Sequence, residues 1–299
     1  MSEVALGTLN FGLPGRPSAA DACCGRILGA YREAGGSVLD TAPTYADGAS
    51  ELMLGRLLRG CRDQFLLGTK FGLRGPGAPF TGGLSRRSLV ESLEGSLRRL
   101  RTDRVDILWV HAWQHGARVE ELLPALDDQV RAGRVLYVGV CNTPAWVVSR
   151  YQTAAQLRDR APFTAMQVEY SLAQRDSDRE LLPMARDLGL PVFAWSPLGR
   201  GRLLRPAGAD GEPGSRARLT AEAAVELGVP PAAVAVAFVR AKGLIPVLGA
   251  SSAAHLAESL QGARLRLPGP VLDRLERASA VQPGWPHAFL ESVQPRMSG

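Results

Sequence analysis

The sequence has little cysteine and no long uncharged apolar run. Its four cysteines, Cys23, Cys24, Cys61 and Cys141, include one adjacent pair and show no metal-ligand spacing. No apolar run approaches the roughly 18 residues that a membrane span needs. The residues after Met1 lack the basic and apolar regions of a signal peptide. We therefore expect reduced thiols, no bound metal, no membrane contact and a cytoplasmic location.

Lysine is nearly absent. Of the 35 basic residues only Lys70 and Lys242 are lysines, and the net charge of +6 raises the question of nucleic-acid binding. The densest basic stretch, residues 85–104, alternates its arginines with acidic residues at helical spacing, which is typical of a solvated helix face. It has no aromatic side chains on which bases would stack. We expect no nucleic-acid partner.

Hydrophobic residues are plentiful, at 45% of the 299 residues, as in a globular protein with a full core. Short apolar runs alternate with stretches of helical periodicity, and continuous runs are typical of strands covered on both faces. The runs are residues 4–10, 37–42, 65–71, 106–112, 135–142, 165–170, 191–196 and 244–249. Alternating strands and helices imply a parallel sheet. Eight such units predict an α/β fold, a single (β/α)8 TIM barrel domain over residues 1–299.

Helices are predicted between the strands, several of them beginning at Ser, Thr or Asp. They cover residues 18–34, 50–58, 85–100, 118–131, 143–159 and 177–188. Two stretches fall outside the repeat. Residues 198–219, after the seventh strand, are rich in Gly, Pro, Ala and Arg and predict a long loop. The tail after the barrel predicts one extra helix at 271–278 and an irregular segment at 283–289.

Polar residues end several of the apolar runs, and barrels of this kind carry their function at the C-terminal ends of the strands. Asp40, Lys70 and His111 end the second, third and fourth runs. Tyr45 follows in the loop after Asp40. We expect the four side chains to meet on one rim. Taken singly, each has an ordinary structural explanation: a helix cap, a surface ammonium, a buried histidine and a packing tyrosine.

Together, the four side chains form a coherent proton donor. A free tyrosine has a pKa near 10, too high for ready donation at neutral pH. A neighbouring ammonium lowers that pKa, and a carboxylate keeps the ammonium charged and in place. We therefore assign Tyr45 as the general acid, Lys70 as the group that tunes it and Asp40 as the partner of Lys70. His111 would orient the carbonyl that receives the proton.

Several motifs occur in a fixed order along residues 6–290. They are Gly7-Thr-Leu-Asn-Phe-Gly12, Asp40-Thr-Ala-Pro-Thr-Tyr45, Gly48-Ala-Ser-Glu51, Gly68-Thr-Lys70, Asp106-Ile-Leu-Trp-Val-His111, Gly133-Arg-Val-Leu-Tyr-Val-Gly-Val-Cys-Asn142, Gln167-Val-Glu-Tyr170 and Trp195-Ser-Pro-Leu-Gly-Arg-Gly201. In this order they resemble the aldo-keto reductase family. The resemblance implies reduction of an aldehyde or ketone by hydride from a nicotinamide cofactor. It also implies that Asp40, Tyr45, Lys70 and His111 form the catalytic tetrad.

The same resemblance places the cofactor at the barrel rim. The sequence has no Gly-x-Gly-x-x-Gly motif after a strand, so it does not support a Rossmann site. It implies that Asn142 and Gln167 hold the carboxamide and that Trp195 stacks on the nicotinamide. Thr8 and Asp40 are expected to contribute as well. The pyrophosphate is expected near Ser196, Leu198, Gly199 and Gly201, with the long loop closing over it. The adenosine end is expected at a helix N-terminus, an anion site, with contacts from Gly249, Ser251, Ser252, His255, Glu258 and Ser259.

The chain departs from the family pattern at the adenosine end. Many relatives carry arginine at the position of Ser252, glutamine at His255 and asparagine at Ser259. NADPH is the expected cofactor, and the missing arginine leaves NADH open as an alternative.

The substrate is expected to be a small carbonyl compound that contacts Tyr45 and His111. Phe11, Trp113 and Trp285 are candidates for the mouth of the site, and packing is an equal alternative for each. Two other functions fit the same scaffold: non-redox dehydratase or lyase chemistry, and a nicotinamide-sensing binding subunit. The sequence indicates no oligomeric state.

Overall fold

Eight parallel strands close into a barrel in which each strand pairs with its sequence neighbours and β8 pairs with β1. The computed structural model describes residues 2–15, 20–76, 79–204 and 215–297. The strands are β1 (Ala5–Gly7), β2 (Val38–Asp40), β3 (Leu66–Phe71), β4 (Val105–Val110), β5 (Val135–Cys141), β6 (Phe163–Glu169), β7 (Val192–Trp195) and β8 (Ile245–Gly249). All eight predicted strands are present, which confirms the (β/α)8 barrel.

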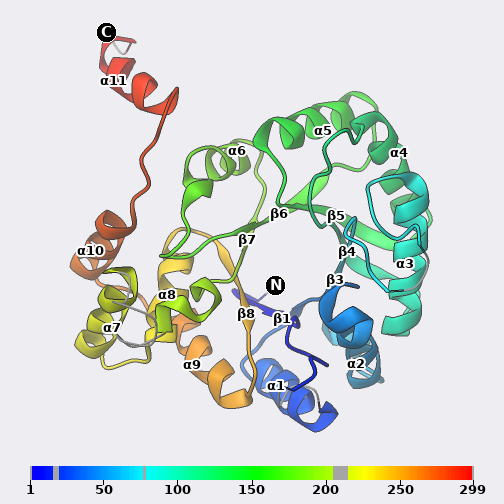
Figure 1. Ribbon diagram of the computed structural model, residues 1–299, viewed down its shortest axis with the longest axis horizontal. Coiled ribbons are helices and arrows are strands. Elements are labelled where there is room, and N and C mark those ends of the chain that lie inside the picture. The colour runs from blue at the N-terminus through cyan, green and yellow to red at the C-terminus, as the bar shows by residue number, and fades with distance from the viewer. Residues whose placement is uncertain (1, 16–19, 77–78, 205–214, 298–299) are drawn as a thin grey trace.

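Eleven helices are described, and all but α11 lie around the strands (Figure 1). They are α1 (Asp21–Glu33), α2 (Ala49–Leu57), α3 (Arg86–Leu100), α4 (Val119–Arg131), α5 (Ala145–Leu157), α6 (Leu181–Asp187), α7 (Ser215–Leu227), α8 (Pro231–Ala241), α9 (Ala253–Arg264), α10 (Gly269–Ser279) and α11 (His287–Met297). The predicted helices correspond to α1–α6 and α10, and the helix expected to begin after Ser251 and Ser252 is α9. The predicted start of α1 at residue 18 lies outside the described residues. A 3₁₀ turn at Asp176–Asp178 replaces the predicted first turn of α6.

Several strands end earlier than the apolar runs predict. After β5 and β7 the cause is the backbone, because Asn142 and Ser196 adopt left-handed φ values of 45° and 55°. Asparagine tolerates this conformation, whereas it is uncommon for serine. The chain turns sharply at both points, which places these residues on the C-terminal rim of the barrel instead of in the sheet.

The barrel interior is filled by side chains, with Trp109 as the largest. Trp109 meets Phe193 edge to face, with ring centroids 5.4 Å apart, and only 2% of it is exposed. The neighbouring strands leave room for it with glycine. A Cβ added at Gly139 would lie 2.3 Å from the Trp109 ring, and one at Gly68 would lie 2.8 Å from its Nε1. This packed interior supports the site residues at the strand ends.

The connection after the seventh strand, predicted as a loop over residues 198–219, differs from that prediction in the part that the structure describes. Gly199–Leu204 forms a 3₁₀ helix and α7 begins at Ser215. Residues 205–214, on which the predicted closing loop mainly depends, lie outside the described residues. Helix α8 was not predicted. It is almost entirely buried and rich in Ala and Val, so it lacks the one-sided apolar pattern of a surface helix.

The C-terminal tail leaves the ring after α10 and carries α11 outside it (Figure 1). Helix α11 has no buried residue and was not predicted. The buried guanidinium of Arg175 anchors α10 by donating to the Glu276 carbonyl at 3.2 Å and to Ser279 Oγ at 3.0 Å. Among the described helices, none is long and apolar enough by itself to cross a membrane. Helices α7 and α8 reach that length and hydropathy only as a pair, bent by 100°.

Candidate active site

Asp40, Lys70 and Tyr45 form one hydrogen-bonded chain at the C-terminal rim. Asp40 ends β2, and Lys70 lies near the end of β3, which pairs with β2. Lys70 Nζ donates to Asp40 Oδ2 at 2.5 Å, to the Thr41 carbonyl at 2.9 Å and to the Tyr45 hydroxyl at 3.0 Å. Three acceptors use all three hydrogens of an ammonium group. The Tyr45 oxygen therefore accepts from Lys70, which leaves the proton of Tyr45 available to another acceptor.

Lys70 is charged although it is buried. Only 1% of its side chain and 6% of that of Asp40 are exposed. Burial lowers the pKa of Lys70, but the adjacent Asp40 carboxylate and Tyr45 outweigh burial and hold that pKa above its ordinary value. A buried charge of this kind is stable only when it is paired and hydrogen-bonded, and Lys70 meets both conditions.

The pKa of Tyr45 differs from the sequence-based expectation. Burial has the largest influence and raises the pKa of Tyr45, Lys70 lowers it and Asp40 raises it, so the net shift is upward. The expected lowering of the Tyr45 pKa by the Lys70 ammonium does not prevail. The site is buried, and the negative charge of Asp40 offsets the positive charge of Lys70. Tyr45 is consequently protonated at neutral pH, as a proton donor must be.

His111 follows β4 and faces Tyr45, with ring centroids 6.4 Å apart at an interplanar angle of 84°. Burial, assisted by the charge of Lys70, lowers the pKa of His111 from 6.5 to about 3, so its imidazole is neutral at neutral pH. Its Nδ1 is buried and has no hydrogen-bond partner in the described part of the chain. An unpaired buried polar atom is costly. Because Nδ1 is closed off from solvent, the other ring nitrogen, Nε2, is the one that a bound group would contact.

The backbone after Tyr45 is strained. Ala46 and Asp47 have left-handed φ values of 47° and 51°, and Gly48 follows at 85°. For residues other than glycine such conformations cost about 1 kcal/mol or more, and they persist only where the surroundings impose them. This turn directs the Tyr45 side chain back toward Lys70.

Glu51 supports that turn from behind, and sequence reasoning assigned it no role. It is fully buried in α2, accepts from Thr69 Oγ1 at 2.6 Å, and pairs with Arg99 Nε at 2.7 Å. These bonds join α2, which follows the turn, to β3 and α3. The sequence signal that could have identified Glu51 is an acidic residue on the apolar side of the helix predicted at residues 50–58.

The residues expected to hold a nicotinamide ring lie on adjacent strand ends. Asn142 donates from Nδ2 to the His111 carbonyl at 2.9 Å and accepts from Trp195 Nε1 at 3.1 Å. Gln167 Nε2 donates to Asp40 Oδ1 at 3.2 Å. The structure therefore brings Asn142, Gln167 and Trp195 together with the tetrad. An amide has two donor hydrogens and two acceptor lone pairs, so Asn142 keeps one of each beyond these bonds.

The turn after β7 holds the four residues expected near a pyrophosphate. Ser196, Gly199 and Gly201 have φ values of 55°, 59° and 83°, and Leu198 packs against the core. The amide of Gly199 donates to the Ser196 carbonyl at 2.8 Å, and that of Gly201 donates to the Leu198 carbonyl at 3.0 Å. Both glycine amides are thus engaged within the turn, which leaves any anion contact here to other groups.

The residues expected at the adenosine end gather at the start of α9. Ser252 is the N-cap and accepts from the His255 amide at 3.2 Å, while Ser251 Oγ lies 2.9 Å from His255 Nδ1. Gly249, Glu258 and His255 are exposed, and a Cβ added at Gly249 would meet nothing within 4 Å. Ser259 is buried, and its hydroxyl donates to the His255 carbonyl at 3.2 Å.

The remaining expected contacts divide by burial. Thr8 is fully buried, and its hydroxyl bonds to Ser50 Oγ at 2.8 Å and to the Asp40 carbonyl at 3.2 Å, so it supports the site from below. Phe11 is fully buried in the main core, which favours the packing alternative. Trp113 is partly buried at the rim after β4, and Trp285 lies in the tail with 86% of it exposed.

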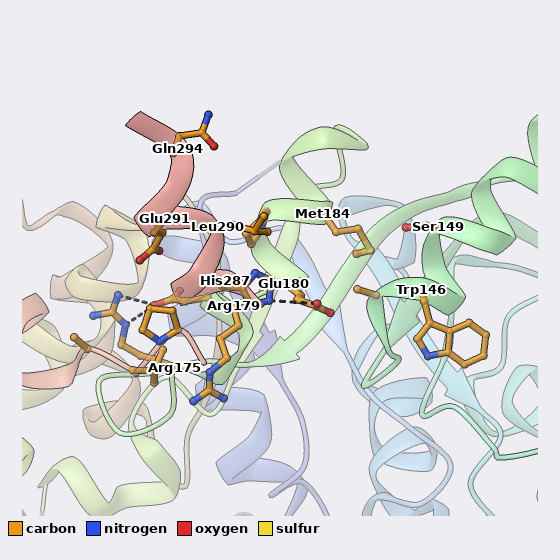
Figure 2. Close-up of a pocket in the computed structure, with 16 residues that line it drawn as sticks. Trp146, Ser149, Arg175, Arg179, Glu180, Met184, His287, Leu290, Glu291 and Gln294 are labelled. Carbon is orange, nitrogen blue, oxygen red and sulfur yellow. Dashed lines mark hydrogen bonds and ion pairs between the residues drawn. The ribbon is translucent and has the colours of Figure 1, made fainter. Parts of the chain in front are cut away.

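A large hollow of about 960 Å³ lies away from the tetrad, between α5, α6 and the tail. Figure 2 shows Trp146 on one side of it, Met184 in the middle, and Leu290 on α11 opposite. His287 pairs with Glu180 at 3.3 Å, so the tail is attached here. In the described residues no group of three or more His, Cys, Asp or Glu side chains is arranged to hold a metal ion.

Comparisons with known proteins agree with this geometry. The model of the aldo/keto reductase family matches residues 3–280. An aldo-keto reductase and a norsolorinic acid reductase of Emericella nidulans are each 34% identical to this chain. Their alignments cover 91% and 98% of this chain, and 76% and 82% of those proteins. An aryl-alcohol dehydrogenase [NADP(+)] of Phanerodontia chrysosporium is 36% identical over 60% of this chain and 49% of its own length. With a family model matched over nearly its whole length and a closed barrel carrying the tetrad, this chain belongs to the aldo/keto reductase family.

Proposed function

We propose that this protein reduces an aldehyde or ketone to an alcohol, with hydride from a nicotinamide cofactor and a proton from Tyr45. One observation carries the proposal: Lys70 Nζ donates to the Tyr45 hydroxyl at 3.0 Å while Asp40 holds the same ammonium at 2.5 Å. Because the ammonium donates to the tyrosine oxygen, the proton of Tyr45 is free for a carbonyl oxygen that is gaining negative charge.

The proton transfer from Tyr45 is assisted by its neighbours. As Tyr45 releases its proton, the positive charge of Lys70 stabilises the phenolate that remains. Asp40 keeps Lys70 charged and in position. Burial of the site strengthens these electrostatic interactions relative to water. The tetrad thus holds an acid that is protonated at rest and is stabilised at the moment of transfer.

His111 positions the carbonyl. Its low pKa keeps the imidazole neutral, so the ring can donate one N–H to the carbonyl oxygen without adding a positive charge beside Lys70. The nitrogen that serves this role is Nε2, because Nδ1 is closed off from solvent. A substrate oxygen held between Tyr45 and His111 lies where the proton is delivered.

The rim residues fit a nicotinamide dinucleotide. The spare hydrogen-bonding capacity of Asn142 suits a carboxamide, the half-buried Trp195 ring offers a flat stacking face, and the open space at Gly249 leaves room for a ligand against the backbone. When bound, the cofactor supplies the hydride. The residues of this chain bind it, orient it and deliver the proton.

For the cofactor we propose NADPH. The start of α9 is a helix N-terminus, which favours an anion, and Ser251 orients the exposed His255 ring beside it. The Phanerodontia relative bears NADP(+) in its name. The absence of an arginine at Ser252 predicts a smaller preference over NADH than an arginine would produce.

For the substrate we propose an aromatic aldehyde or ketone. Relatives of this chain are named for aryl alcohols and for norsolorinic acid. Trp113 lies after β4, two residues beyond His111, and offers an aromatic face to such a ring.

A turnover assay tests this function. Purified protein with NADPH and a panel of substituted benzaldehydes and acetophenones should consume reduced nicotinamide and form the matching alcohol in equal amounts. Product formed without nicotinamide consumption would replace the proposal with non-redox chemistry. Tight NADPH binding without turnover on any panel member would replace it with a sensing role.

A further inference from the structure

Arg200 occupies a conspicuous position in the turn after β7. Its backbone has φ 57° and ψ 35°, a left-handed conformation that is uncommon for arginine, between Gly199 and Gly201, which also have positive φ. Three successive residues of this kind make a tight turn directly after β7. The Arg200 side chain is 64% exposed, yet it has defined partners.

Those partners are Glu169 and Trp195, which are register neighbours on β6 and β7. Arg200 Nε lies 3.3 Å from Glu169 Oε1, and its Nη2 donates to Oε2 at 3.4 Å. The guanidinium carbon lies 5.2 Å from the Trp195 ring centroid, a cation–π distance. One arginine thus spans an acidic side chain and the ring on which we place the nicotinamide.

Stability does not account for this arrangement. An ion pair this exposed adds little to the free energy of folding, and the left-handed backbone at Arg200 opposes folding. Strained residues that cluster beside a ligand site are held there by the surrounding fold, and their strain is commonly part of function. In the same turn the Gly199 and Gly201 amides donate to carbonyls of the turn itself. These two amides are therefore not available to a phosphate, and the Arg200 side chain is a source of positive charge at this point.

We propose that Arg200 is a movable anion-binding residue, held by Glu169 in the protein alone and transferred to the cofactor pyrophosphate on binding. The inference rests on the proposed function. Arginine suits this exchange because its planar guanidinium binds carboxylate and phosphate in the same two-pronged manner. Glu169 then acts as a competitor that sets cofactor affinity, and Arg200 leaves the Trp195 ring as the cofactor arrives.

Calorimetric titration with three ligands tests the exchange. NADPH and 2′-phospho-ADP-ribose contain the pyrophosphate, whereas 2′,5′-ADP lacks it. For Arg200→Gln we expect roughly tenfold weaker binding of the first two and no change for the third. For Glu169→Gln we expect tighter binding of the first two. The double variant should bind like Arg200→Gln alone, because Glu169 competes only through Arg200.

Arg202→Gln is the matched control, since Arg202 lies in the same turn but donates to the Gly199 carbonyl at 3.1 Å. It should bind all three ligands as the wild type does. Equal losses for Arg202→Gln, an unchanged Arg200→Gln, or weaker binding by Glu169→Gln would overturn the exchange while wild-type binding still supports the proposed function. A wild type that binds neither NADPH nor NADH would overturn both the exchange and the proposed function.

Discussion

Lys70 contacts Asp40 and Tyr45 with the same nitrogen, at 2.5 Å and 3.0 Å, and only 1% of its side chain is exposed. One buried ammonium therefore links a carboxylate that must be neutralised to the hydroxyl that we propose as the proton donor. In the proposed function, folding stability and catalysis depend on the same atom, but for different reasons. Substitutions can separate the two contributions.

Lys70→Met should remove the contribution of Lys70 to stability and its contribution to catalysis. Turnover should fall by about 10²–10⁴, because Tyr45 loses the charge that stabilises its phenolate. Unfolding free energy should fall by roughly 3–5 kcal/mol, because Asp40 remains buried without its partner. Asp40→Asn/Lys70→Met should regain most of that stability and none of the activity, as measured by chemical denaturation and steady-state assays. A double variant as unstable as the single one would show that the pair is not the cause.

Acid should destabilise the protein through His111. Its folded pKa of about 3 lies below its unfolded value of 6.5, so the unfolded state binds more protons between these values. The stabilising contribution is therefore complete above pH 6.5 and is lost as pH falls toward 3, at up to about 1.4 kcal/mol per pH unit. Denaturant unfolding of the wild type and His111→Gln across this range should show the shallower loss in the variant. Parallel curves would contradict the buried neutral histidine.

The glycine beneath Trp109 should tolerate no side chain. In Gly139→Ala the new Cβ would lie 2.3 Å from the Trp109 ring inside the barrel, and such overpacking costs about 1–3 kcal/mol. Gly29→Ala is the control, since Gly29 lies in α1 with nothing within 4 Å of an added Cβ. That change should stabilise the protein by roughly 0.5–1 kcal/mol. Thermal unfolding measures both, and equal effects would refute the packing argument.

Ser252→Arg should sharpen cofactor choice. A guanidinium at the start of α9 would add a charge-assisted contact to a 2′-phosphate, which favours NADPH over NADH by about tenfold or more. Loss of the Ser252 cap should cost about 1 kcal/mol of stability. Fluorescence titrations with both cofactors measure the preference. An unchanged ratio of dissociation constants would place the adenosine end elsewhere.

The barrel and the tetrad were predictable because their signals are local. Continuous apolar runs predict buried parallel strands. Lys70 stands out because the chain has only two lysines and this one ends such a run. Since parallel strands present their ends on one rim, the meeting of Asp40, Lys70 and His111 followed from topology. The structure brings Asp40, Lys70 and Tyr45 into direct contact and sets His111 against the Tyr45 ring.

The features that sequence reasoning missed depend on tertiary structure. Helix α8 is a short Ala/Val-rich run, which periodicity cannot separate from a strand. Helix α11 buries nothing and therefore shows no apolar face. The direction of the Tyr45 pKa depends on burial, and the Arg200–Glu169 pair depends on a turn of left-handed residues. Neither burial nor such a turn is visible in residue spacing.

The central claim, that Tyr45 is the proton donor, is tested most directly by single-turnover kinetics. Tyr45→Phe loaded with NADPH should bind the cofactor as the wild type does and reduce an accepted benzaldehyde about 10²–10⁴ times more slowly. Tyr137→Phe, at a tyrosine that is 54% exposed, should behave as the wild type. Near-normal hydride transfer by Tyr45→Phe would contradict the assignment of Tyr45 and the account of the site built on it.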